Sequence, residues 1–296
     1  MAHRVERHHR PTGVTTAPVC YGLVLEGAPV WGRLEELIGV APGQTDWPRV
    51  TIECVAPGPG DPQEAYFDDR RADLPCLFGG WLSADRESMT ATFAREPEPG
   101  AELLAHPGLA GVGVLFARWL GRAAFHGGLV LGAEGAFGVL GPKGAGKTTT
   151  LAMLAQAGYT VLSDDLTVVA DGKAFGGPRV LDLRADAASR VDAELRTVSA
   201  RGRRRRRMTL PAGPTQVPIC GWIYLQVGRE VTAHPVPPAD RLARLGQHLA
   251  HSLVTPSAVD FLSLGTLPAW SVSRPLAWDV VPKLVEVIGG LIGASR

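Results

Sequence analysis

Residues 141–148 have the types and the spacing that could bind a nucleoside triphosphate. They read Gly-Pro-Lys-Gly-Ala-Gly-Lys-Thr, with glycines at the first and sixth positions, then lysine and a hydroxyl residue. Glycines let a backbone turn tightly, so that successive N–H groups point at phosphate oxygens. Lys147 would reach the β- and γ-phosphates, and the Thr148 hydroxyl would ligate Mg²⁺. The predicted nucleotide-binding residues are Gly141, Pro142, Lys143, Gly144, Ala145, Gly146, Lys147, Thr148 and Thr149.

Two consecutive carboxylates follow this loop at a short distance. Asp164 comes 17 residues after Lys147, and Asp165 is next to it. The intervening chain holds one helical pattern, 148–157, and one strand pattern, 159–163. An acidic residue at the end of a strand beside the loop is where a triphosphate site needs its second magnesium contact. We therefore predict that Thr148 and Asp164 bind the metal.

The chain before the loop predicts a β-hairpin. Residues 126–131 and 136–140 are short apolar runs that are separated by the turn Gly-Ala-Glu-Gly. Because a hairpin pairs its strands antiparallel, the sheet around the loop should be mixed, with the second strand feeding the loop. Apolar residues at helical spacing predict a further helix over 109–119.

The remaining pattern divides the chain into three parts. Residues 1–18 are predicted to be a disordered tail, 19–100 a β-rich module, and 101–296 the domain that carries the loop. In the last part we expect helices over 184–195, 239–252, 257–263 and 278–292, a strand over 270–273, a basic loop over 199–207, and a hairpin of 218–227 with 230–236.

Composition limits the classes of function. The 296 residues are 45% hydrophobic and 20% charged, with a formal net charge of +1, which gives no overall drive toward nucleic acid or a membrane. We find neither an apolar stretch that could span a bilayer nor a signal peptide, so a cytoplasmic location is expected. Structural thiols are expected at the four scattered cysteines, Cys20, Cys54, Cys76 and Cys220.

Five arginines in succession, residues 203–207, allow more than one interpretation. A charge run is usually a solvated loop, and no aromatic residues interleave here for stacking on bases. A functional interpretation is that one or two of these arginines clamp a triphosphate or an acidic substrate segment. The apolar stripe of the last helix is either core or a subunit interface, so a homo-oligomer stays open.

Taken together, the residues resemble the catalytic domain of the HPr kinase/phosphorylase family. The resemblance rests on His126-Gly127, the hairpin, residues 141–148, the short helix, and Leu162-Ser163-Asp164-Asp165. The layout is more closely similar to single-chain HPr-kinase-like proteins of bacterial natural-product clusters, including kinases that modify lasso-peptide precursors. The match covers about residues 109–236.

This resemblance implies a fold, an activity and roles for particular residues. The fold would be α/β, a mixed-sheet P-loop kinase core of the HPr kinase/phosphoenolpyruvate carboxykinase type. It would bind ATP and Mg²⁺ and phosphorylate a serine of a peptide or protein. The implied catalytic residues are Lys147, Asp164, Asp165 and His126, with His126 beside the carboxylate and tuning it. A second, Glu-containing signature of the family is absent from residues 180–217, which speaks against the reverse reaction and against HPr as the substrate.

Four alternative functions differ in the sequence signatures that they require. A GTPase switch needs an Asn-Lys-x-Asp motif, and this chain contains no Asn. A transporter-type ATPase needs a Ser-Gly-Gly-Gln-like signature, which is also missing. A small-molecule kinase with the same core, or a non-catalytic nucleotide-binding accessory protein, remains open, as do the phosphate acceptor and the nucleobase.

Overall fold

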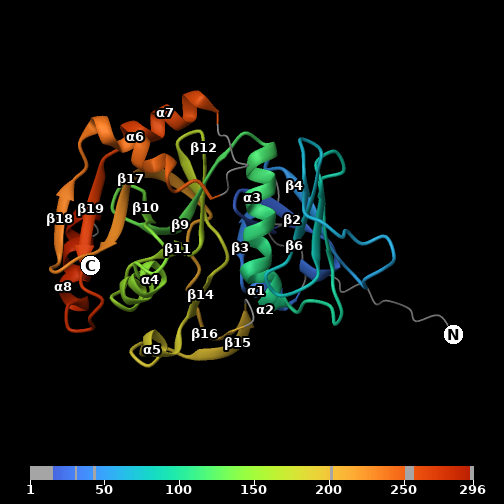
Figure 1. Ribbon diagram of the computed structural model, residues 1–296, viewed down its shortest axis with the longest axis horizontal. Helices are drawn as coiled ribbons and strands as arrows, with labels where there is room; N and C mark the ends of the chain where they lie inside the picture. Colours follow the sequence, from blue (N-terminus) through green and yellow to red (C-terminus); the bar gives the residue numbers. More distant parts are fainter. Residues whose placement is uncertain (1–15, 31, 43–44, 201–202, 251–256, 294–296) are drawn as a thin grey trace.

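The computed structural model describes residues 16–293, except 31, 43–44, 201–202 and 251–256 (Figure 1). Most of the predicted tail, 1–15, lies outside the described residues. The expectation is wrong for residues 16–18, because they belong to the first strand, β1. No helix among the described residues has the length and apolar character needed to cross a membrane.

The N-terminal part forms one eight-stranded sheet. Its order is β3-β1-β2-β4-β8-β7-β6-β5, with parallel pairs at β2–β4 and β4–β8 and antiparallel pairs elsewhere. This agrees with the β-rich pattern of the sequence. The strands are β1 (Thr16–Cys20), β2 (Leu23–Glu26), β3 (Gly39–Pro42), β4 (Arg49–Val55), β5 (Tyr66–Phe67), β6 (Arg71–Pro75), β7 (Trp81–Asp85) and β8 (Thr90–Ala94), with short helices η1 (Ala28–Val30) and α1 (Arg33–Glu36) between β2 and β3.

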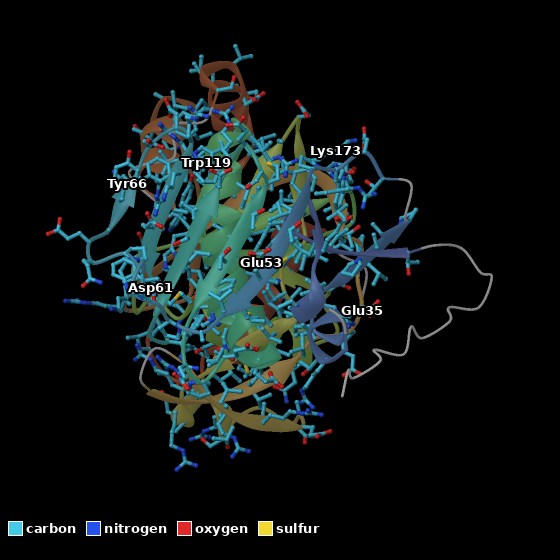
Figure 2. The ribbon with its side chains drawn as sticks, turned by 90° about the vertical axis from the view of Figure 1, so that its right-hand side faces the viewer. Glu35, Glu53, Asp61, Tyr66, Trp119 and Lys173 are labelled. Carbon is cyan, nitrogen blue, oxygen red and sulfur yellow. The ribbon has the colours of Figure 1, made fainter. Side chains whose placement is uncertain are left out.

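Alternation along these strands separates an inner from an outer face. On β4, Val50 and Ile52 are fully buried, while Glu53 points outward and accepts a hydrogen bond from Thr92 of β8. Figure 2 views this outer face, where Glu53 lies near the middle of the sheet. Such a period of two is expected for a sheet with one face covered.

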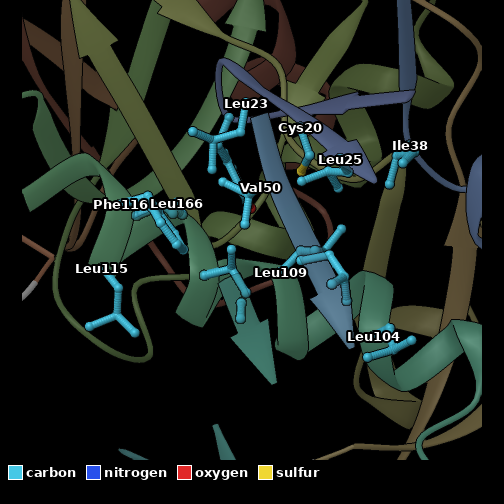
Figure 3. Packing of buried hydrophobic residues seen from close by; sticks show 14 of the residues in the cluster. Cys20, Leu23, Leu25, Ile38, Val50, Leu104, Leu109, Leu115, Phe116 and Leu166 are labelled. Carbon is cyan, nitrogen blue, oxygen red and sulfur yellow. The ribbon is translucent and has the colours of Figure 1, made fainter. Parts of the chain in front are cut away.

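A helix covers the inner face. The chain continues through α2 (Ala101–Leu103) and the irregular turn η2 (Leu104–Gly108) into α3 (Leu109–Trp119), which confirms the helix predicted there. α3 contacts β7 of the first sheet and β9 and β12 of the second. The core beneath it joins Leu23 and Leu25 to Leu109, Phe116 and Leu166 (Figure 3). The division at residue 100 stays a prediction, since one hydrophobic core extends across it.

The second sheet is mixed, as the hairpin predicted. Its order is β10-β9-β12-β13-β17-β19-β18, and β10 also pairs parallel with β17. The pairings of β10, β9, β12, β13 and β17 therefore form a closed ring. β9 and β10 form the predicted antiparallel hairpin. The strands are β9 (Ala123–Leu131), β10 (Ala136–Leu140), β11 (Val161–Ser163), β12 (Leu166–Ala170), β13 (Lys173–Phe175), β17 (Gln216–Val227), β18 (Thr232–Pro235) and β19 (Ala269–Arg274).

Helices flank the second sheet, and a small sheet adjoins it. α4 (Lys147–Gln156) packs against α8 (Val281–Ile292), and α6 (Pro238–Gly246) packs against α7 (Ala258–Thr266) at the other end in Figure 1. Three antiparallel strands, β14 (Val180–Leu183), β16 (Arg203–Thr209) and β15 (Leu195–Ala200), form the small sheet. The apolar residues of α8, Leu284 and Ile288, are buried in the core, which settles them as core residues.

The structure corrects three expectations. The predicted hairpin of β17 with β18 is wrong, because β19 lies between them and pairs with both. The helix predicted over 184–195 is only the single turn α5 (Ala185–Ala188). The residues predicted as a basic loop, 199–207, belong to the strands of the β15–β16 hairpin, except for 201–202, which lie outside the described residues. Local patterns cannot decide which strands pair, because the pairing partners of β16, β17 and β18 depend on distant strands.

Candidate functional site

The segment 141–148 is a tight connection between a strand and a helix. β10 ends at Leu140, and α4 begins at Lys147. Gly141, Gly144 and Gly146 have φ angles of 150°, 90° and 87°, in the region that disfavours side chains. A Cβ on Gly141 would lie 2.4 Å from the carbonyl oxygen of Leu225. The predicted strand–loop–helix layout is therefore confirmed, and its glycines are required by the backbone.

Lys147 is nearly buried at the start of α4. Its Nζ donates to the carbonyl oxygens of Gly141 and Pro142, at 2.8 and 3.3 Å. Burial lowers the pKa of Lys147, and the nearby charges of Asp165 and Asp164 oppose that shift. The ammonium group thus lies inside the curve of the loop, where phosphate oxygens could replace the carbonyl partners.

Thr148 and Asp164, the two predicted metal ligands, contact each other, while metal binding by them stays a prediction. The Thr148 hydroxyl donates to Asp164 Oδ1 at 3.0 Å, and Asp164 is 6% exposed. Burial and the charge of Asp165 raise the pKa of Asp164 well above its usual range. A divalent cation here would satisfy the carboxylate that burial disfavours. The described residues contain no group of three or more His, Cys, Asp or Glu that could hold a metal, so a cation would also need oxygens from phosphates and water.

A histidine that sequence reasoning missed connects Asp165 to a third carboxylate. His106 Nε2 lies 3.0 Å from Asp165 Oδ2, and His106 Nδ1 lies 2.9 Å from Asp182 Oδ2. Burial alone would lower the pKa of His106, but the two carboxylates outweigh it and raise the pKa to about 9. An imidazolium with two N–H donors fits this bridge. The one local signal is the following Pro107, which favours the extended backbone that His106 has, with φ −152° and ψ 125°.

Arg207 fixes the far end of this bridge. Its Nε and Nη2 donate to the two carboxylate oxygens of Asp182 at 2.6 and 2.7 Å, and Nη1 donates to Glu102 Oε2 at 2.9 Å. Although burial raises the pKa of Asp182, hydrogen bonds from Arg207 and His106 lower it to about 2. Charges therefore alternate along Arg207, Asp182, His106 and Asp165, and this buried series holds Asp165 in place.

The interpretation of residues 203–207 as a solvated loop is thus wrong. These residues lie in β16, where successive side chains alternate between two faces. Arg207 is 1% exposed and paired, Arg205 is half-buried on the same face, and Arg204 and Arg206 are exposed on the other. Alternation, rather than the number of arginines, decides which of them reach the site.

Arg274, at the end of β19, is a second residue that the sequence did not reveal. It is 5% exposed, and its Nε and Nη1 have no hydrogen-bond partner in the described part of the chain. A Cβ on Gly146 would lie 3.2 Å from Arg274 Nη2, so the guanidinium adjoins the loop. A buried guanidinium without an acceptor is costly. An anion bound at the loop would supply the acceptor.

One cavity of about 310 Å³ brings most of the predicted residues together. It is lined from the loop and α4, from the Asp164–Asp165 pair, and from Arg205 and Arg274. Among the predicted residues, its lining includes Lys143, Gly144, Gly146, Lys147, Thr148, Thr149, Asp164, Asp165 and His126. Gly141 and Pro142 line a neighbouring open cavity instead, and Ala145 is buried in the core.

His126 differs in part from its predicted setting. It lies within β9 rather than at the start of the strand, opposite Leu166 of β12, and is exposed. It lines the cavity together with Asp165. The imidazole that bridges Asp165 to Asp182 is that of His106, and a tuning role for His126 stays a prediction.

The raised pKa of His106 makes stability depend on pH. The folded-state pKa of about 9 exceeds the ordinary value of 6.5, so the stabilisation is complete below about 6.5 and is lost as pH rises through 9. Asp165, Asp182, Asp164 and Arg207 are the charged groups that face this ring. The free energy of unfolding of the wild type, relative to His106→Gln, should fall by on the order of 3 kcal/mol between pH 6.5 and 9.5.

Urea unfolding at the two pH values measures this difference. His234→Gln is the matched control, because His234 is exposed on β18. Equal pH slopes for the wild type and His106→Gln would contradict the charged bridge.

Comparisons with known proteins found a distant structural similarity and no related sequence. No protein-family model and no curated protein matches the chain. Among solved structures, the chain is similar to the Hpr(Ser) kinase/phosphatase from Coxiella burnetii, with 8% sequence identity, a TM-score of 0.30, and coverage of 57% of this chain and 95% of that one. A TM-score this low does not by itself establish a common fold.

Proposed function

We propose that this protein is a Mg²⁺- and nucleotide-dependent kinase that transfers the γ-phosphoryl group of ATP to a hydroxyl, most simply a serine of a peptide or protein. The observation that carries the proposal is the 310 Å³ cavity, whose lining includes Lys147, Arg274 and Asp165. Cations that could bind a triphosphate thus line the same cavity as a carboxylate that could accept the proton of the acceptor hydroxyl.

The residues present fit a nucleoside triphosphate. The N-terminus of α4, a helix of 10 residues, carries N–H groups without intrahelical partners and the positive end of the helix dipole. Lys147 adds one cation beside it, and Arg274, whose Nε and Nη1 have no partner among the described residues, adds a second. Thr148 and Asp164 would hold Mg²⁺, which neutralises charge on the β- and γ-phosphates when bound.

Phosphoryl transfer requires the chain mainly to align the acceptor hydroxyl with the γ-phosphorus. The acceptor hydroxyl oxygen forms a bond to the γ-phosphorus while the bond from that phosphorus to the β,γ-bridging oxygen breaks, and ADP leaves with the electron pair. The hydroxyl proton passes to Asp165 and then to solvent. His106 orients Asp165, and it acts as a positioning residue because its hydrogen bond goes to the carboxylate rather than to substrate.

Incubation with Mg²⁺-ATP and candidate peptides, including natural-product precursor peptides, tests this function by mass. One added phosphate on a serine is the expected result, and it should be lost in Lys147→Ala. Phosphorylation of small alcohols alone would favour a metabolite kinase. Nucleotide binding without transfer to any acceptor would favour a non-catalytic accessory protein.

Replacement of Arg274 should separate nucleotide binding from stability. In the proposed complex, Arg274 donates a hydrogen bond to a phosphate oxygen, and such a bond between charged groups is worth about 1.5–3 kcal/mol. Arg274→Met removes this bond, so the Kd for Mg²⁺-ATP should rise roughly 10- to 150-fold. The same change removes an unpartnered buried charge, so the melting temperature should hold or rise. Calorimetric titration with a non-hydrolysable ATP analogue and a thermal melt measure both effects.

The matched control is Arg229→Met, at an exposed arginine beyond β17. An unchanged Kd in Arg274→Met would remove this residue from the nucleotide site. A large drop in melting temperature would show that the guanidinium has a structural partner instead.

A further inference from the structure

A second cavity meets the first at Asp165. It has a volume of about 240 Å³, and its lining includes both Asp165 and His126, which also line the first cavity. None of the residues of the 141–149 loop lines it. Its walls come from the N-terminal sheet, from α3, and from His126 and Leu166 of the second sheet, so it lies between the two sheets. Asp165, whose carboxylate is proposed to accept the hydroxyl proton, therefore lies where the two cavities meet.

The walls of this second cavity are apolar. Leu82 of β7 and Phe93 of β8 form one wall, and Ala110 and Val114, one turn apart on α3, form another. Leu77, in the connection between β6 and β7, stands at the rim and is 59% exposed. No lysine or arginine is among its described lining residues. An acidic or phosphorylated occupant would find no counter-charge here, whereas an apolar one would bury its surface.

A glycine lines the cavity where α3 approaches Leu82 of β7. Gly111 lies within α3, where glycine costs a helix about 1 kcal/mol relative to alanine. A Cβ at this position would lie 3.1 Å from Leu82 Cδ2, the only atom it would meet closely. A larger side chain would therefore project toward the Leu82 wall and reduce the space.

From this arrangement we propose that the second cavity is the acceptor subsite. It takes the apolar side chain of the residue next to the phosphorylated serine or threonine of a peptide. The hydroxyl then lies at Asp165, with the triphosphate on the other side. This inference rests on the proposed kinase function. The occupant is a peptide side chain because about 240 Å³ is less than the roughly 300–1,000 Å³ of pockets that enclose whole small ligands, and because the apolar surface continues outward over Leu77.

Peptide libraries with one central serine and one fixed flanking residue test the inference. The chain should phosphorylate peptides with Leu, Met or Phe at one flanking position about ten- to a hundredfold faster, in kcat/KM, than peptides with Asp or Lys there, since burial of one apolar side chain supplies that factor. Ala110→Leu should reduce the rate with Phe and spare the rate with Ala. Leu77→Asp should lower the apolar preference and raise the rate with Lys.

Controls separate this inference from the proposed function. Val259→Asp, at a 75% exposed residue of α7, should leave the preference unchanged. Binding of the best peptide, labelled with fluorescein, is measured by anisotropy without nucleotide, and it should weaken in Ala110→Leu and Leu77→Asp while ATP binding stays constant. Peptide phosphorylation without any flanking preference, or with a preference that neither variant alters, would overturn the subsite alone. Failure to phosphorylate any peptide, or transfer to small apolar alcohols only, would overturn the peptide occupant together with the proposed function.

Discussion

Asp165→Asn should lower the rate of phosphoryl transfer about 10²- to 10⁴-fold, the usual contribution of a positioned proton acceptor. The amide keeps the shape of the side chain but can no longer take the hydroxyl proton. Because Lys147, Arg274 and the start of α4 remain, the Kd for Mg²⁺-ATP should change little. Steady-state transfer to the best peptide and calorimetric nucleotide titration measure the two effects on one preparation.

The matched control is Asp279→Asn, at an exposed aspartate outside the cavity lining. Full transfer activity in Asp165→Asn would remove Asp165 as the base, and Asp164→Asn would be tested next. A large loss of ATP affinity would instead place Asp165 in nucleotide binding. The pKa of His106 should fall in Asp165→Asn, since one of the two carboxylates that raise it is lost.

Arg207→Met should have the largest effect on stability. It leaves the carboxylate of Asp182 buried without its two-point partner, and removal of one member of a buried pair costs about 3–5 kcal/mol. The free energy of unfolding, from urea titration followed by circular dichroism, measures the loss. Transfer activity should also fall, because Asp182 would no longer hold His106 against Asp165.

Arg204→Met is the control on the same strand. Arg204 is exposed on the opposite face of β16, so its replacement should change stability by no more than about 0.5 kcal/mol. Equal effects of the two substitutions would show that the arginines act through net charge, which would contradict the buried series. The double variant Arg207→Met with Asp182→Leu should regain part of the lost stability, because no unpaired charge remains.

The alternating charges explain how Arg207, Asp182 and His106 can be buried, because each has a partner of opposite charge. Arg207, Asp182, His106 and Asp165 come from β16, β14, the segment before α3, and the turn after β11. Each element is fixed by packing elsewhere, so the carboxylate at the end of the series has little freedom. In the proposed reaction, pre-organisation of this kind would remove reorganisation cost at the moment of transfer.

What the sequence determined by itself is the chemistry that depends on neighbours along the chain. The glycines of residues 141–148, the lysine and threonine after them, and the Asp164–Asp165 pair are fixed by local spacing, and the structure brings all of them except Gly141 into one cavity. The β9–β10 hairpin was predictable for the same reason, because its turn and both strands are contiguous.

Only the tertiary structure decided which distant groups meet these residues. His106 reaches Asp165 and Asp182 across 59 and 76 residues of sequence, and Arg274 reaches the loop only because β19 inserts between β17 and β18. The arginine run showed positive charge, but β16 pairing decided that Arg207 is buried and its neighbours are not. Non-local strand pairing sets these positions through burial and register, which no local pattern encodes. For the loop this means that the sequence predicted phosphate-binding chemistry, while the fold supplied the carboxylate support and the apolar cavity beside it.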